Sequence, residues 1–178
     1  MYCINNVKIS VLFHSNKPIS IFNTIAEKRH TTVVQKRNIV IINDIYSITI
    51  FKKLSNKYHI NVTGIRSLSL ISSVVDWLIN SYCKRIDFQL IRYQIDNITA
   101  TFDIGFSISL HSLAHAYNSS RYNPERFPGL HYKTDWGTAI VFKSGKVNIV
   151  GCKSENEIIS IWSMIKEKIG VALRKSIS

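Results

Sequence analysis

Residues 122–153 read YNPERFPGLHYKTDWGTAIVFKSGKVNIVGCK, and the first half of the chain carries a weaker copy of this pattern. Three pairs of identical residues recur at separations of 91, 91 and 87 residues: Asn6 with Asn97, Phe51 with Phe142, and Gly64 with Gly151. A common separation near half the chain length indicates an internal repeat. The sequence therefore predicts two units that pack as one pseudo-symmetric body.

The size of the chain, 178 residues of which 46% are apolar, suits one large domain or two small ones with a packed core. No segment reaches about 18 uninterrupted apolar residues, and the N-terminal segment lacks the order of a signal peptide. We therefore expect an intracellular protein that is not inserted in a membrane. The cysteines Cys3, Cys83 and Cys152 have no paired spacing, so we expect reduced thiols and no metal or other cofactor.

The charge is strongly basic, with 23 Lys and Arg residues against 11 Asp and Glu residues and a formal net charge of +12. A basic surface of this strength favours a polyanionic partner, and nucleic acid is the leading candidate. Charge alone is weak support, because many basic proteins use it only for solubility.

The order of predicted elements is the same in each half: a strand, a short helix, strands in hairpins and one long helix. In the first half, alternating apolar residues predict strands at 7–13, 39–42, 46–51 and 58–63, with helices at 18–27 and from 67 to about 84. In the second half they predict strands at 98–106, 129–132, 138–142 and 147–150, with a short helix at 110–117. Ser154 and Glu157 form a capping box that begins the last helix.

No linker rich in Gly, Pro or Ser separates the halves, which we place at 1–89 and 90–178. Their strands are therefore expected to join one curved antiparallel sheet, with both long helices behind it and the other face open. This is an α+β fold of two pseudo-symmetric repeats.

The chain resembles the conserved core of the TATA-box-binding protein family over nearly its whole length. The most specific part is YNPERFPGL followed by VFKSGKVNIVGCK, whereas NNVKISV, SIFNTIA, QKRN, TIF and NVTGIRS match more loosely in the first half. The resemblance implies a saddle whose concave face covers the minor groove, with its helices on the convex face. It also implies a DNA-binding transcription initiation factor that bends AT-rich promoter DNA, a well-known case of minor-groove binding with apolar wedges.

The residues expected to contact bases agree with this resemblance. The minor groove of A·T pairs presents only acceptors, and an Asn amide donates two hydrogen bonds. Asn6 and Asn97 are therefore expected at the centre of the site, with Thr63 and Val150 on its apolar floor. Family position makes Phe127 and Phe142 a pair of wedges, that is, apolar side chains inserted between base pairs, and Phe51 matches one wedge of the first repeat.

Other roles follow from family position alone. Phosphate contacts are implied for six basic residues: Arg37, Lys57, Arg66, Lys133, Lys146 and Lys153. A TFIIB-like initiation factor, and through it the RNA polymerase machinery, is expected to bind at the turn that carries Glu125, Pro128, Gly129 and Leu130. Whether the free protein forms a homodimer stays open.

The first repeat departs from the family pattern at several positions. Alignment places Asn38, or alternatively His30, where the second wedge of this repeat is expected, and neither is a good wedge. Lys8 and Thr99 stand where the family has apolar residues. We therefore expect an asymmetric kink in bound DNA, stronger at the end held by the second repeat.

Two other classes of function were weighed against DNA binding. Catalysis is not expected, because no catalytic motif is present and the pair His111 and His115 lacks the further ligands of a metal site. The better rival is a protein-interaction scaffold that keeps the fold but binds DNA weakly or without specificity. The composition fits a cellular or a viral origin, so the expected location is the nucleus or a cytoplasmic site of viral transcription.

Overall fold

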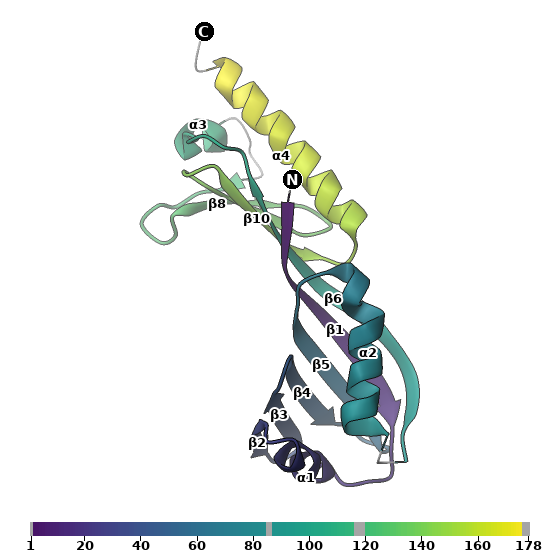
Figure 1. The fold of residues 1–178 in the computed structure, drawn as a ribbon. Helices are drawn as coiled ribbons and strands as arrows, with labels where there is room; N and C mark the ends of the chain where they lie inside the picture. Colours follow the sequence, from purple (N-terminus) through teal and green to yellow (C-terminus); the bar gives the residue numbers. More distant parts are fainter. Residues whose placement is uncertain (1, 85–86, 116–119, 176–178) are drawn as a thin grey trace. The chain divides into compact units, whose positions relative to one another are not determined.

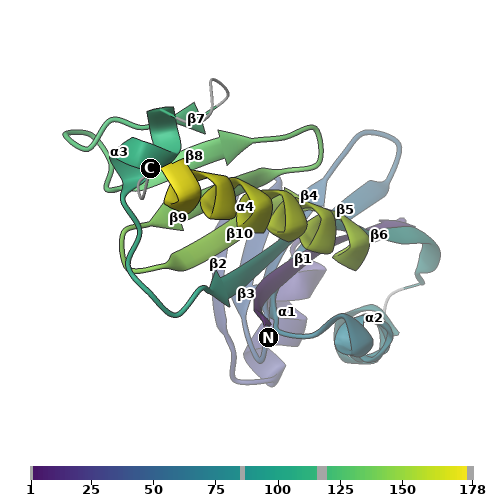
Figure 2. The same cartoon turned by 90° about the horizontal axis from the view of Figure 1, so that it is seen from above.

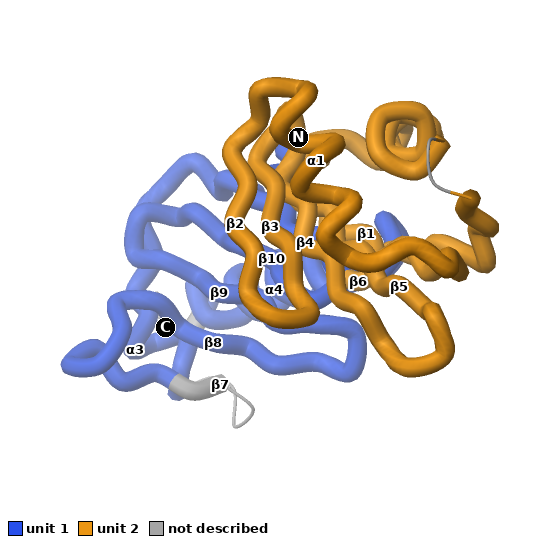
Figure 3. The backbone as a smooth tube through the Cα atoms, turned by 90° about the horizontal axis from the view of Figure 1, so that it is seen from below, with its two compact units in different colours: residues 1–5, 97–178 blue, residues 6–96 orange. Residues whose placement is uncertain are grey.

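The structure is a computed structural model, in which residues 2–84, 87–115 and 120–175 are described (Figure 1). The chain forms two compact units (Figure 3): unit 2 comprises residues 6–96, and unit 1 comprises residues 1–5 and 97–178. The halves expected from the repeat, 1–89 and 90–178, divide the chain elsewhere. The difference arises because strand β1 (Tyr2–His14) begins in unit 1 and strand β6 (Gln89–Asp103) begins in unit 2.

Unit 2 contains an antiparallel sheet with the strand order β2-β3-β4-β5-β1. Its remaining strands are β2 (Thr32–Lys36), β3 (Ile39–Asn43), β4 (Ser47–Lys52) and β5 (Lys57–Ile65). The four strands predicted for this half are confirmed, with shifted ends. Strand β2 was not predicted, since none of its residues is buried and its apolar pattern is short.

The helices of unit 2 differ in part from the prediction. Helix α1 (Ile21–Lys28) lies close to the predicted helix, whereas the predicted long helix is a 3-10 turn (Leu68–Leu70), α2 (Ile71–Leu78) and a π-helical turn (Ile79–Cys83). In the π-helical turn, the N–H of Lys84 donates to the carbonyl of Ile79 at 2.8 Å. Within this turn, the hydroxyl of Tyr82 donates to Asp44 Oδ2 at 2.6 Å.

Unit 1 contains an antiparallel sheet with the strand order β6-β10-β9-β8-β7. Its further strands are β7 (Ser120–Arg121), β8 (Gly129–Lys133), β9 (Thr138–Phe142) and β10 (Lys146–Cys152). Helix α3 (Leu110–His115) precedes β7, and the end of the predicted helix, residues 116 and 117, lies outside the described residues. Helix α4 (Glu155–Lys175) runs across the sheet and contacts β9 and β10 (Figure 2).

The capping box at the start of α4 is confirmed. Glu157 N–H donates to Ser154 Oγ at 3.3 Å, and Ser154 N–H donates to Glu157 Oε2 at 3.3 Å. The apolar residues predicted from helical spacing are buried: Ile158, Ile161, Ile165 and Ile169. Each unit thus pairs an antiparallel sheet with helices, which confirms the predicted α+β class.

Candidate nucleic-acid interface

In each sheet, alternate residues are buried against the helices, and the residues between them lie on the opposite side. In β4, for example, Ile48 and Ile50 are fully buried, whereas Thr49 and Phe51 are half-buried. We call this second side the open face of each unit. Strand pairing assigns to the open face of unit 2 the residues Ile39, Ile41, Thr49, Phe51, His59, Asn61 and Thr63, and to that of unit 1 the residues Gly129, His131, Thr138, Ile140, Phe142, Asn148 and Val150.

Both expected central asparagines are held in the same way. The amide oxygen Oδ1 of Asn6 accepts a hydrogen bond of 2.7 Å from the N–H of Gly64, and Asn97 Oδ1 accepts one of 2.7 Å from the N–H of Gly151. This contact fixes which end of each amide faces the protein. The Nδ2 group is left as the donor, and in Asn97 it makes only a long contact of 3.4 Å with Thr99 Oγ1.

The two glycines lie at β-bulges, where one strand has an extra residue. In β5 the pairing register shifts between Val7 and Ile9 of the partner strand, and in β10 it shifts between Ile149 and Cys152. Gly64 and Gly151 have φ angles of +97° and +94°, which residues with a side chain rarely adopt. The bulge therefore explains the glycine at each site and turns its N–H toward the asparagine.

The expected wedge pair of unit 1 surrounds a glycine. The rings of Phe127 and Phe142 lie 6.0 Å apart, and Phe127 is 40% exposed. A Cβ atom at Gly129 would stand 2.7 Å from the ring of Phe127 and 3.1 Å from that of Phe142. The glycine thus leaves the space in which the two rings lie side by side.

Unit 2 has no equivalent pair. Ile39 pairs with Phe51 as Gly129 pairs with Phe142, so a branched side chain occupies the position of the glycine. Phe127 stands two residues before Gly129, and the residue two positions before Ile39 is Arg37, an exposed turn residue with φ +44°. The strand register therefore puts neither Asn38 nor His30 at the position of the second wedge. Phe51 instead contacts His59, with ring centroids 6.3 Å apart.

A further pair of matching hydrogen bonds shows how the two open faces differ. In unit 1, Thr101 Oγ1 donates to Asn5 Oδ1 at 2.8 Å, whereas in unit 2 Ser10 Oγ donates to Asp96 Oδ1 at 2.9 Å. Unit 2 therefore has a carboxylate where unit 1 has an amide. Lys8, which stands where the family has an apolar residue, forms an ion pair with Asp96 at 3.4 Å.

The ion pair and the hydrogen bonds keep Asp96 ionised. Burial raises the pKa of Asp96, but hydrogen bonds from Gln94, Ser10 and Lys8 outweigh burial and leave the pKa below its usual range. The charge of Lys8 is thus largely offset by a neighbouring acid.

The six basic residues expected to contact phosphates are all exposed: Arg37, Lys57, Arg66, Lys133, Lys146 and Lys153. The two ion pairs found in the described part of the chain, Lys8 with Asp96 and Arg29 with Asp44, involve none of them. Their charges are thus available to a polyanion. The other base-contact candidates, Thr63 and Val150, are half-buried on the open faces of their units.

The expected protein-binding turn is only partly accessible. Glu125 and Pro128 are exposed, but Leu130 is 1% exposed and Gly129 is buried under the two Phe rings. Glu125 and Pro128 are thus accessible to a partner, whereas Leu130 and Gly129 are buried in the free protein, and the role of these four residues in partner binding stays a prediction.

Residues that the repeat pattern did not single out also lie on or beside the open face of unit 2. Among them are Ser10, His59, Asn61, Arg92 and Gln94. Their alternation with buried Tyr58, Ile60 and Val62 in β5 was a usable signal for His59 and Asn61. Among the described residues, no three His, Cys, Asp or Glu side chains are grouped so as to hold a metal ion. The helices in this part of the chain are too short or too polar to cross a membrane.

Comparison with known proteins independently supports the resemblance to the TATA-box-binding protein family. Residues 92–170 match the family model described as "Transcription factor TFIID (or TATA-binding protein, TBP)". The TATA-box-binding protein of Aeropyrum pernix is 32% identical over 113 residues, which cover 61% of this chain and 55% of the relative. That of Pyrodictium occultum is 40% identical over 67 residues, which cover 36% of this chain and 34% of the relative. The chain thus matches about half, or less, of the length of these relatives.

The solved structure of Methanococcus jannaschii TBP extends the similarity to the whole fold. It superimposes with a TM-score of 0.79 and 26% identity, over 95% of this chain and 98% of that one. The family model matches residues in the second half of the chain, and the structural match covers both halves. On these grounds the chain belongs to the TATA-box-binding protein family.

Proposed function

We propose that this protein is a DNA-binding transcription initiation factor that binds and bends AT-rich duplex DNA through the minor groove. The observation that carries the proposal is the matched orientation of Asn6 and Asn97. Each amide is held by its oxygen, so each Nδ2 group is the end that would donate to the acceptors A N3 and T O2, and the long contact of Asn97 Nδ2 with Thr99 leaves it hydrogen-bonding capacity. A G·C pair adds an amino donor in the same groove, which would oppose these amides.

The apolar side chains of the open face support bending. Phe127 and Phe142 are two adjacent rings with partly exposed surfaces, as insertion into a base step requires. Opening a base step costs on the order of a few kcal/mol, which added contact with the widened groove offsets. Phe51 would act alone in unit 2, beside the floor residue Thr63.

The exposed basic residues would hold the sugar-phosphate backbone. Each phosphate contact makes binding more sensitive to salt: the slope of the log of the binding constant against the log of the salt concentration becomes more negative by about one. The proposal includes recruitment of a TFIIB-like factor, and thereby of RNA polymerase, through the exposed Glu125 and Pro128 of the 122–128 turn.

A second candidate is an interaction scaffold with weak or non-specific DNA binding. The ionised Asp96 and its ion pair with Lys8 favour it, because a carboxylate on the open face of unit 2 repels DNA. Ile39 at the position of Gly129 also favours it, since unit 2 then lacks a wedge pair.

The decisive experiment is fluorescence anisotropy of an AT-rich TATA-type duplex and a GC-substituted duplex, each titrated across a salt series. We expect a preference for the AT-rich duplex that persists as salt rises, and that falls in Asn97→Ala and Phe127→Ala. Asn156→Ala and Ile159→Ala are matched controls, because both residues are exposed on α4.

The outcomes separate the two candidates. Preference that survives salt and is lost only in the open-face variants supports the initiation factor. Equal, salt-sensitive affinity for both duplexes, or no binding, shifts the assignment to the scaffold.

A further inference from the structure

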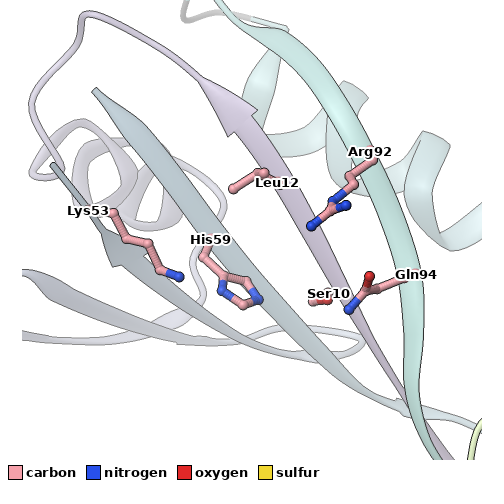
Figure 4. A pocket seen from close by; sticks show the side chains of 6 residues that line it. All are labelled: Ser10, Leu12, Lys53, His59, Arg92 and Gln94. Atoms are coloured by element: carbon pink, nitrogen blue, oxygen red, sulfur yellow. The ribbon is translucent and has the colours of Figure 1, made fainter. Parts of the chain in front are cut away.

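A small cavity lies within unit 2, beside Phe51, whose ring contacts that of the lining residue His59. It has a volume of about 120 Å³ and is lined by Ser10, Leu12, Lys53, His59, Arg92 and Gln94. Figure 4 shows Lys53 and Arg92 extending from opposite sides toward the ring of His59. Residues from β1, β5 and β6 and from the segment after β4 therefore converge on one small volume.

Three of the lining groups have hydrogen-bond donors that no described residue uses. His59 Nε2 is buried and has no hydrogen-bond partner. The ammonium of Lys53 and the guanidinium of Arg92 form no ion pair in the described part of the chain. A buried polar atom without a partner costs about 1–3 kcal/mol, so a group that satisfies it would be bound favourably.

The charge of the site selects an anion. Lys53, Arg92 and Lys8 are cations, and the carboxylate of Asp96 is the acid beside them, so the cluster is positive overall. Burial lowers the pKa of His59, and Lys53 lowers it further, so the imidazole is neutral at pH 7. A neutral imidazole offers one N–H donor, which suits an oxyanion without adding charge.

The volume of the cavity limits which ligands can fit. A drug-sized molecule needs roughly 300 Å³ or more, whereas one water takes about 30 Å³ of liquid. A volume of about 120 Å³ suits a single tetrahedral oxyanion. Arg and Lys are the side chains that usually bind phosphate, with Arg able to donate two parallel hydrogen bonds.

We propose that this cavity is a phosphate site, in which Arg92, Lys53 and His59 hold one backbone phosphate of the duplex. This inference rests on the proposed DNA binding. It adds a contact in β6 and beside β5, and it uses different side chains from unit 1, where Lys146, itself an expected phosphate contact, stands at the position of His59. A phosphate contact at this site would also offset the repulsion between DNA and the nearby carboxylate of Asp96.

The first test uses inorganic phosphate alone, so that it does not depend on DNA. NMR resonances of the His59 ring are followed during titration with phosphate and, separately, with chloride at matched ionic strength. We expect a saturable shift with phosphate that is absent in Arg92→Gln and strongly reduced in Lys53→Gln. Lys28→Gln is the matched control, because Lys28 is exposed at the end of α1 and away from the cavity.

The second test measures binding of the AT-rich duplex across a salt series by the same variants. Arg92→Gln removes one phosphate contact, so the slope of the log of the binding constant against the log of the salt concentration should become shallower by about one. Lys28→Gln should leave this slope unchanged. Unchanged melting temperatures would show that these variants remain folded.

The results distinguish failure of this site from failure of the proposed function. If wild-type protein binds the duplex, but phosphate leaves His59 unchanged and Arg92→Gln keeps the full slope, the phosphate site is overturned and DNA binding stands. If phosphate shifts His59 but the wild-type protein binds no duplex, the assignment to a DNA phosphate falls together with the proposed function.

Discussion

The amide oxygen of Asn97 accepts a 2.7 Å hydrogen bond from the N–H of Gly151, and the same contact joins Asn6 to Gly64. The glycine in each case lies at a β-bulge with positive φ. A residue with a side chain at this backbone position would be strained, so the bulge, the glycine and the amide orientation form one structural unit.

This relationship leads to a prediction for Asn97→Asp. A carboxylate can still accept the hydrogen bond from Gly151, so we expect the melting temperature to stay within a few degrees of the wild-type value. It has no N–H to donate and adds negative charge, so affinity for the AT-rich duplex should fall by tenfold or more, about 1.4 kcal/mol. Anisotropy titration and thermal unfolding measure the two effects, and wild-type affinity in this variant would contradict the role of the amide.

The arrangement of bulge, glycine and asparagine could be predicted from the sequence only in part. The spacing of Asn6, Asn97, Gly64 and Gly151 predicted two matching sites, because identical residues in a repeat occupy equivalent positions. It did not predict that the glycines orient the amides, since a bulge depends on pairing between strands far apart in the chain. The cluster of Ser10, Lys53, His59 and Arg92 was missed for the same reason.

Prediction from the sequence was most reliable where one local pattern decides the structure. The capping box and the apolar spacing of α4 depend on neighbours along the chain, and both are confirmed. The segment expected as one helix from 67 to about 84 is helical from Leu68 to Cys83, but its type changes from 3-10 to α to π, which local spacing does not reveal. Nor does local spacing reveal that Tyr82 bonds to Asp44 in a distant hairpin. The second wedge of unit 2 was misplaced because its position depends on the pairing of Ile39 with Phe51.

Gly129→Ala tests whether the glycine makes room for the wedge pair. The added methyl group would lie 2.7 Å from Phe127 and 2.8 Å from Ile140, so at least one ring must move. We expect a loss of about 1–3 kcal/mol in the free energy of unfolding, measured in urea, together with weaker bending of bound DNA. The matched control is Gly170→Ala in α4, where no atom lies within 4 Å of the new methyl group. That control should be neutral or stabilise by up to about 1 kcal/mol, and equal effects of the two substitutions would contradict a steric role for Gly129.

Asp44 should make the stability of unit 2 depend on pH in the acidic range. Burial raises its pKa, but hydrogen bonds from Tyr82 and Arg29 outweigh burial and leave the pKa below its usual range. A carboxyl group with a depressed pKa stabilises the fold above its unfolded pKa of about 4, and this stabilisation is lost as pH falls through the folded value. Asp44→Asn should therefore lower the melting temperature at pH 7, and the difference from wild type should shrink on acidification. A difference that stays constant from pH 7 to pH 2 would contradict this explanation.

The three cysteines should differ in reactivity. Burial raises the pKa of Cys83 to about 12 and, with the nearby Glu157, that of Cys152 to about 11, whereas Cys3 is exposed. Because the thiolate is the reactive form, a thiol reagent at pH 8 should modify Cys3 alone in the folded protein and all three after unfolding. Cys3→Ser should abolish the fast reaction, and rapid labelling of more than one thiol in the native protein would argue against the burial of the other two.

The kink in bound DNA should be stronger at the end held by unit 1. There Phe127 and Phe142 can enter a base step together, whereas in unit 2 Phe51 has Ile39 beside it and an exposed Arg37 at the position of the second wedge. Two rings open a step further than one, and the cost of unstacking is met by contact on both sides. A 2-aminopurine reporter placed at either end of the duplex should therefore gain more fluorescence at the unit 1 end. Phe142→Ala should reduce that signal with little effect on the other end, and Phe51→Ala should do the reverse. Equal signals at the two ends, or equal kinks in a bound structure, would show that Ile39 or Arg37 replaces the missing ring, and the proposed asymmetry would have to be abandoned.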